Sequence, residues 1–125
     1  TTVARALRLI EQGALDDSGM EALCERLGIG TRHLTRLFAE QLGTSPARLA
    51  RTLRTQRAKR LIDEGEASMA EVARMAGFGG VRAFNRAITD LYGRAPTALR
   101  SAVAKNRRRD FKPAHGGLLH AKSHD

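Results

Sequence analysis

The stretch Met20-Glu-Ala-Leu-Cys-Glu-Arg-Leu-Gly-Ile-Gly30 recurs 49 positions later as Met69-Ala-Glu-Val-Ala-Arg-Met-Ala-Gly-Phe-Gly79. Both stretches begin with methionine and end with an apolar residue between two glycines. Apolar residues recur at helical spacing ahead of the first glycine, which suits a left-handed helix end. The sequence therefore predicts one short helix followed by one tight turn, present twice in the chain.

The similarity continues beyond the two turns, with an offset of 50 after one inserted residue, Gly80. The matching positions are apolar, glycine or proline: Leu34 with Phe84, Phe38 with Ile88, Gly43 with Gly93, and Pro46 with Pro96. A second helix thus follows each turn, and Ile29 or Phe78 supplies a buried apolar plug in the turn. Two short helices joined in this way form a helix-turn-helix.

The predicted fold is all-α, with two helix-turn-helix subdomains, a long connecting helix and about seven helices. Aromatic residues make up only 4% of the chain, which favours packed helices over a sheet. We expect a double helix-turn-helix domain over residues 1–100 and a basic, flexible tail over residues 101–125. Within the domain the expected parts are unit one (about 3–46), the connector (46–64) and unit two (about 68–100).

The sequence also predicts the length of the connector and the residues that cap two of the helices. A helix over residues 46–64 would be about 28 Å long. That is close to the ~34–36 Å between successive major-groove faces on one side of B-DNA. Ser18 with Glu21, and Ser68 with Glu71, are candidate capping boxes that would open the first helix of each unit.

Charge and composition narrow the class of partner. The 125 residues carry a formal net charge of +9, divided between both parts of the chain, which indicates a polyanionic partner, nucleic acid ahead of membrane. No run of ~18 apolar residues predicts a membrane span. A single cysteine, Cys24, excludes an internal disulfide and fits a reducing, cytoplasmic setting.

The second helix of each unit is predicted to have one buried and one exposed face. The expected buried stripes are Leu34, Leu37, Phe38 and Leu42 in unit one, and Phe84, Ala87, Ile88 and Leu91 in unit two. The opposite faces carry Arg32, Thr35, Arg36 and Ala39 in unit one, and Arg82, Asn85, Arg86 and Thr89 in unit two. Arginine and asparagine pair bidentately with guanine and adenine in the major groove. An ordinary solvated helix face is the alternative for either helix alone, but the repetition favours DNA.

The chain resembles the AraC/XylS family of transcriptional regulators over roughly residues 3–100. The residues that carry the resemblance are Leu23-Cys24 through Leu37-Phe38, Gly43-Thr-Ser-Pro46, Arg57-Ala-Lys-Arg-Leu-Ile62, Val72-Ala73, Gly77-Phe78 and Tyr92-Gly93-Arg-Ala-Pro96. Residues 5–16 and 31–38 look most like Ada-type regulators, which join this module to a methyl-accepting zinc domain and often to an alkylation-repair enzyme. The cysteine-rich segment of those proteins is absent here, so its chemistry is not assigned to this chain.

The resemblance and the helix faces together give the predicted DNA-binding set. It comprises Thr31, Arg32, His33, Thr35 and Arg36 in unit one, and Val81, Arg82, Ala83, Asn85 and Arg86 in unit two. Val81 and Ala83 depart from the polar residues common at those family positions. Unit two is therefore expected to read fewer bases, or to contact mainly the backbone and thymine methyl groups.

Some residues that could carry other chemistry have simpler interpretations. Cys24 takes the repeat position of Ala73 and is expected to be a small buried residue rather than a nucleophile. For His33, a phosphate contact and a plain surface position stay open. The basic run over residues 105–109 is either a solubilising tail or a phosphate contact. The histidines at positions 115, 120 and 124 form a weak metal site at best. The connector arginines Arg48, Arg51, Arg54 and Arg60 are expected to form a mixed surface, from which one or two could contact phosphate.

The predicted function is sequence-specific binding of double-stranded DNA for bacterial transcription regulation, with no catalytic residue, cofactor or metal. Two alternatives stay open: a non-catalytic DNA-binding arm of an alkylation-repair protein, and a protein-interaction module that docks on RNA polymerase. The sequence does not set the oligomeric state, and a monomer is compatible with it.

Overall fold

The computed structural model describes residues 1–110, which form eight α-helices and no strand. The helices are α1 (Thr2–Glu11), α2 (Ala14–Asp17), α3 (Met20–Leu27), α4 (Thr31–Leu42), α5 (Pro46–Glu64), α6 (Met69–Ala76), α7 (Val81–Tyr92) and α8 (Pro96–Asp110). The predicted all-α class is confirmed, with one helix more than the seven expected. The additional helix is α2, whose four residues are too few to show an apolar stripe.

The first four helices enclose one hydrophobic cluster. Its buried members are Val3, Ala6, Ile10, Ala14, Leu23, Cys24, Leu27, Leu34, Phe38 and Ala50. Ile29, the predicted plug, is partly buried and packs against this cluster. The preceding Gly28 ends α3 with φ 75°, a left-handed conformation that glycine adopts without strain. Cys24 is buried, as its match to Ala73 predicts.

A second cluster lies under α6, α7 and the start of α8, and it shares no member with the first. Its buried members are Ala58, Ile62, Val72, Ala73, Ala76, Phe84, Ile88 and Leu99. Phe78, the second predicted plug, meets Phe84 edge to face with ring centroids 5.8 Å apart. Each repeat unit therefore has a hydrophobic core of its own.

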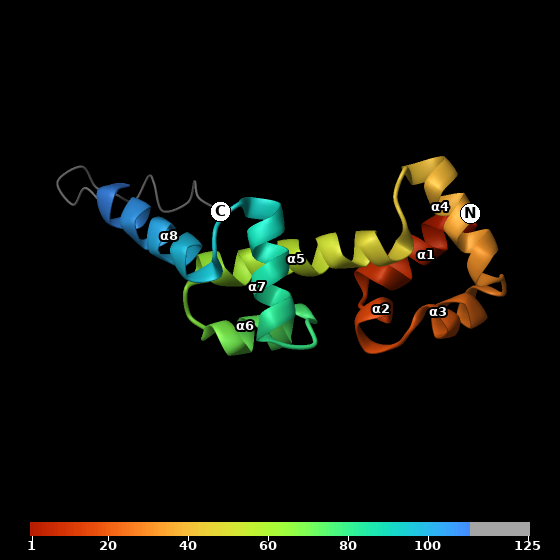
Figure 1. Ribbon diagram of the computed structural model, residues 1–125, viewed down its shortest axis with the longest axis horizontal. Coiled ribbons are helices and arrows are strands. Elements are labelled where there is room, and N and C mark those ends of the chain that lie inside the picture. The colour runs from red at the N-terminus through yellow and green to blue at the C-terminus, as the bar shows by residue number, and fades with distance from the viewer. Residues whose placement is uncertain (111–125) are drawn as a thin grey trace.

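Helix α5 runs through both units and is the long axis of the molecule (Figure 1). It begins at Pro46, after Ser45, whose hydroxyl accepts a hydrogen bond from the Arg48 amide over 3.1 Å. It contributes Ala50 to the first cluster, and Ala58 and Ile62 to the second. The connector thus belongs to both cores and separates the two units along its length.

Only one of the two candidate capping boxes exists. Ser68 caps α6: its hydroxyl accepts from the Glu71 amide over 3.2 Å, and the Glu71 carboxylate accepts from the Ser68 amide over 3.1 Å. The prediction for Ser18 and Glu21 is wrong, because Gly19 takes the N-cap position of α3. The Ser18 hydroxyl instead donates to the carbonyl of Ala14, at the end of α2.

Helix α8 extends past the predicted start of the tail. The boundary expected at residue 100 falls inside α8, because residues 101–110 contain no glycine or proline to stop the helix. Arg100 attaches α8 to the end of α5: its guanidinium donates to the carbonyls of Leu61, Ile62 and Ala67 over 3.4, 3.3 and 2.5 Å. The backbone of the basic run at 105–109 lies in this helix. Residues 111–125, with the three tail histidines, lie outside the described residues.

Candidate nucleic-acid interface

Helix α4 presents a basic, exposed face because its apolar residues are buried in the first core on the opposite side. Leu34 and Phe38 are both fully buried. The side chains of Arg32, Thr35 and Arg36, on the other side of the helix, are exposed. Ala39 is exposed as well, one turn further on. We call Arg32, Thr35 and Arg36 the first reading face.

Helix α7 repeats this arrangement in the second unit. Phe84, Ala87 and Ile88 are buried, as predicted. Arg82, Asn85 and Arg86 are exposed on the opposite side and form the second reading face. The two faces thus carry the same order of side chains, with an arginine, a small polar residue and a second arginine.

The remaining members of the predicted set are exposed at the starts of the same helices. Thr31 and His33 lie in the first turn of α4, and Val81 and Ala83 in the first turn of α7. Neither helix has a side-chain cap: their N-cap residues are Gly30 and Gly80. The first amides of both helices are consequently open to an external acceptor.

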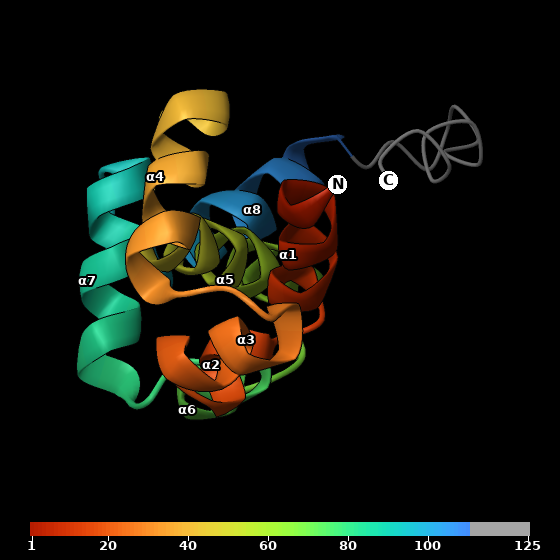
Figure 2. The ribbon, with the colours of Figure 1, turned by 90° about the vertical axis from the view of Figure 1, so that its right-hand side faces the viewer.

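The two helices that carry the reading faces lie on one side of the molecule (Figure 2). Seen along α5, helices α4 and α7 lie together on one side of it, whereas α1 lies on the other (Figure 2). The 19 residues of α5 give it a length of about 28 Å. The fold therefore presents two similar basic helices in the same direction, one at each end of the connector.

The arginines of the reading faces carry positive charge that no carboxylate of residues 1–106 pairs with. In residues 1–106, ion pairs involve Arg51, Arg54, Arg57 and Lys59, and none involves an arginine of α4 or α7. The guanidinium of Arg36 has one side-chain partner, Nδ1 of His33, at 3.1 Å. An exposed row of such arginines favours a polyanion.

The predicted apolar stripes are too long at their C-terminal ends. Leu42 and Leu91 are 41% and 48% exposed, although the periodicity predicts both in the buried stripes. Both lie in the last turn of their helices, where the helix extends beyond the cluster that its earlier residues cover. Leu37, nearer the middle of α4, is partly buried against the first cluster.

The expectation of a mixed surface on the connector holds for Arg48, Arg51 and Arg60, which are exposed, but is wrong for Arg54. Arg54 and Arg57 both bind the carboxylate of Asp16 on α2, and the Asp16 side chain is only 9% exposed. No local sequence pattern signals this group, because its members are about 40 residues apart and meet only in the folded chain.

Two further observations concern other kinds of site. Among the side chains of residues 1–106, His, Cys, Asp and Glu form no group of three that could hold a metal ion. No helix in this part of the chain combines the length and apolar character of a membrane-spanning segment.

Comparisons with known proteins agree with this geometry. A family model described as a helix-turn-helix domain matches residues 23–102. A probable bifunctional transcriptional activator/DNA repair enzyme AlkA from Mycobacterium tuberculosis is 40% identical over 102 residues, which are 82% of this chain and 21% of that protein. This chain therefore spans about a fifth of the length of that relative.

Solved structures show the same fold. The DNA-binding domain of AdpA, a global transcriptional factor solved in complex with a target DNA, superposes with a TM-score of 0.73 at 28% identity, covering 86% of this chain and 93% of that one. An AraC-type transcriptional regulator from Chromobacterium violaceum has a TM-score of 0.73 at 24% identity, covering 82% and 92%. The chain belongs to the helix-turn-helix domain family whose model matches residues 23–102. It has the fold of the AraC-type regulator and of the DNA-bound AdpA domain.

Proposed function

We propose that this domain binds double-stranded DNA with α4 and α7 in two successive segments of the major groove. The observation that carries the proposal is the equivalence of the two reading faces. Their helices, α4 and α7, lie on one side of α5 (Figure 2). A connector of about 28 Å suits two helices that enter the groove one DNA turn apart. We therefore call α4 and α7 the recognition helices.

In this proposal some exposed groups contact base edges and others contact the DNA backbone. Arg32, Arg36, Arg82 and Arg86 are suited to guanine edges, and Asn85 to adenine. Thr35 can donate to or accept from a base edge. Of the remaining predicted residues, Thr31, Val81 and Ala83 flank these side chains, and His33 holds Arg36 through a hydrogen bond. The uncapped helix starts suit phosphate oxygens.

The proposal assigns the domain no catalysis of its own. Cys24, the single cysteine, is buried in the first core and cannot reach a substrate. A monomer suffices for binding, because one chain already presents both recognition helices. Such a domain would act in the bacterial cytoplasm, at the nucleoid. Contact with RNA polymerase is a separate possibility, and it predicts partner binding that survives loss of both reading faces.

Selection from a random duplex library, followed by footprinting, tests the proposal. We expect a motif of two short blocks about one helical turn apart, bound by one chain. A single block would contradict the role of the second recognition helix. Binding without any enriched motif, lost steeply as salt rises, would reduce the domain to a non-specific electrostatic anchor.

A second candidate function is favoured by one comparison. The relative at 40% identity is named as both a transcriptional activator and a DNA repair enzyme. This chain would then be the DNA-binding arm of a longer protein whose repair chemistry lies in other domains. The gene sequence on either side of this segment decides the matter: an adjoining repair-enzyme domain supports this candidate, and a ligand-binding domain contradicts it.

A further inference from the structure

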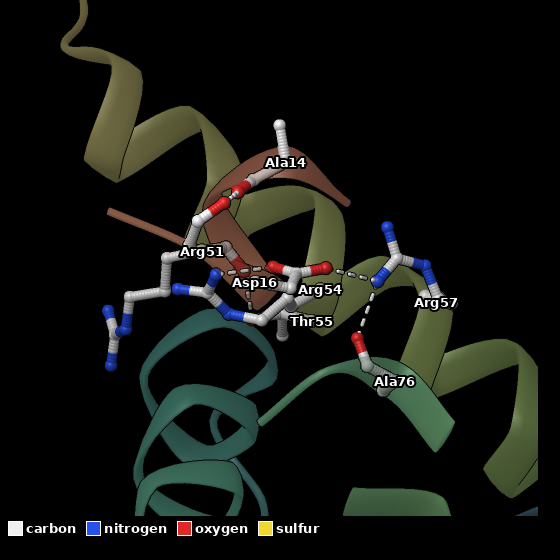
Figure 3. A network of polar contacts seen from close by, with 8 residues as sticks. Ala14, Asp16, Arg51, Arg54, Thr55, Arg57 and Ala76 are labelled. Carbon is white, nitrogen blue, oxygen red and sulfur yellow. Dashed lines mark hydrogen bonds and ion pairs between the residues drawn. The ribbon is translucent and has the colours of Figure 1, made fainter. Parts of the chain in front are cut away.

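One carboxylate of the first unit binds two cations of the connector. Oδ1 of Asp16 lies 2.6 Å from Nη1 of Arg54, and Oδ2 lies 3.0 Å from Nη1 of Arg57 (Figure 3). The three side chains are 9%, 19% and 26% exposed. Charge-assisted hydrogen bonds in such a shielded position are stronger than ion pairs on the open surface.

The same two arginines contact the turn of the second unit. Nη1 of Arg57 also donates to the carbonyl of Ala76 over 2.5 Å. Ala76 is the last residue of α6, where carbonyls lack partners within the helix and carry the negative end of its dipole. The guanidinium of Arg54 lies over the ring of Phe78, 5.7 Å from its centroid. Each arginine therefore joins Asp16 to the turn between α6 and α7.

Asp16 itself lies directly against that turn. A Cβ atom placed on Gly77 would be 2.7 Å from Oδ2 and 2.9 Å from Cγ of Asp16, which is closer than packed atoms allow. Helix α7 begins four residues after Gly77. The group formed by Asp16, Arg54, Arg57 and the carbonyl of Ala76, which we call the Asp16 bridge, thus holds the first unit to the segment that leads into the second recognition helix.

Other contacts between the units are weaker. The two hydrophobic clusters share no residue, and within the described part of the chain α5 is the one helix that contributes buried residues to both. A further ion pair joins Arg51 of α5 to Asp90 of α7, but the two side chains are 44% and 58% exposed. Exposed pairs of this kind add little to stability. The orientation of the units therefore depends mainly on α5 and the Asp16 bridge.

We propose that Asp16 is a positioning residue for DNA recognition: through Arg54 and Arg57 it fixes the orientation of α7 relative to α4, and so the spacing of the two DNA blocks. This inference rests on the proposed function, in which both helices enter the groove. It assigns a role in spacing selectivity to residues that lie away from both reading faces.

The test compares Asp16→Asn with Asp17→Asn. Asparagine keeps the size of aspartate but loses the charge that both guanidiniums share. Asp17 lies next to Asp16 on α2 and is exposed, so its replacement makes the same change in net charge without touching the bridge. A loss caused only by altered attraction to DNA would appear equally in both variants.

The first measurement is made without DNA. Spin labels are attached to cysteines at Gln41 on α4 and Ala70 on α6, which are both exposed, in a Cys24→Ala background. Double electron–electron resonance should give one narrow distance distribution for the unaltered bridge and for Asp17→Asn. Asp16→Asn should broaden it while the circular dichroism of the helices is unchanged. An unchanged distribution would overturn the inference.

The second measurement uses duplexes in which the two blocks are at the selected spacing, or displaced by one or two base pairs. We expect Asp16→Asn to discriminate between spacings at least about fivefold less well, the lower end of typical coupling between sites. Affinity for a duplex with a single block should not change. A broadened distance with full spacing discrimination would overturn the role in recognition.

Two controls keep the outcomes distinct. Arg57→Gln removes one of the two arginines and leaves Arg54 with Asp16, so it should reproduce part of the loss seen for Asp16→Asn. The double variant should lose less than the sum of the two single losses, because the changes share one contact. If Asp16→Asn does not fold, Arg57→Gln serves as the test. If the chain without any substitution in the bridge shows no spacing preference, that result contradicts the proposed function instead. The distances between the spin labels then still decide whether Asp16 holds the two units together.

Discussion

Nη2 of Arg36 lies 3.1 Å from Nδ1 of His33, one turn earlier on the exposed side of α4. Because a guanidinium can only donate, Nδ1 accepts the hydrogen bond and the ring proton is on Nε2. The pair leaves Nε2–H and the other donors of Arg36 available to an acceptor. It also restrains a long side chain that would otherwise lose rotamer freedom on binding.

Replacing His33 should therefore weaken DNA binding through Arg36. We expect His33→Ala to lower affinity for the selected duplex by less than Arg36→Ala does. In an Arg36→Ala background the same replacement should have almost no effect, because the contact is already gone. Fluorescence anisotropy on all four combinations measures this. Additive losses would show that His33 contacts DNA on its own account.

The reading faces themselves predict a loss that depends on DNA sequence. Arg36→Ala or Arg86→Ala should each cost about 1–3 kcal/mol of binding to the selected duplex, and much less on random duplex. Arg8→Ala is the matched control, because α1 lies on the side of α5 away from both recognition helices (Figure 2). Equal losses on the two duplexes would leave these arginines only a backbone role.

Two glycines with left-handed backbones should differ in their tolerance of alanine. Gly93, with φ 74° and no atom within 4 Å of the position that a Cβ would take, should lose only the backbone preference, about 1–2 kcal/mol. At Gly77, with φ 102°, the added methyl group would also collide with Asp16. Urea unfolding should therefore show a larger loss of unfolding free energy for Gly77→Ala. Equal losses would mean that Asp16 moves aside without cost.

Replacing the two serines of the candidate capping boxes should lower the free energy of unfolding by different amounts. Ser68→Ala removes a working N-cap and should lower the free energy of unfolding by about 0.5–2 kcal/mol. Ser18→Ala removes only a hydroxyl donor to the Ala14 carbonyl at the end of a short helix, so we expect a smaller change. Thermal unfolding followed by circular dichroism distinguishes them, and the reverse order would contradict the assignment of Gly19 as the cap.

Local patterns explain how much of this fold the sequence predicts. The duplicated stretches around Gly28 and Gly77 indicate the turns, the plugs and the helices on either side, because helix stops and apolar spacing depend on near neighbours. The same patterns locate the exposed set on α4 and α7. They fail at Leu42 and Leu91, since the end of a core is set by what packs against a helix and not by its own periodicity.

The Asp16 bridge is beyond prediction for a related reason. Asp16 looks like one of two neighbouring acids, and Arg54 like one of several connector arginines. Their pairing depends on how α2 and the turn at Gly77 meet across α5, which is a property of the assembled fold. The continuity of α8 past residue 100 is likewise hidden by its charge, which resembles that of a tail.

The separation of the two cores has a consequence for how such a domain can diverge. Because no buried residue is shared, exposed side chains on α7 can change without repacking the core beneath α4, and the reverse also holds. The base preference of each recognition helix can therefore change independently of the other. The spacing between the two DNA blocks depends on other residues, those of α5 and the few around Asp16. In this chain, the residues that would read the base sequence are therefore separate from the residues that would set the spacing between the two binding blocks.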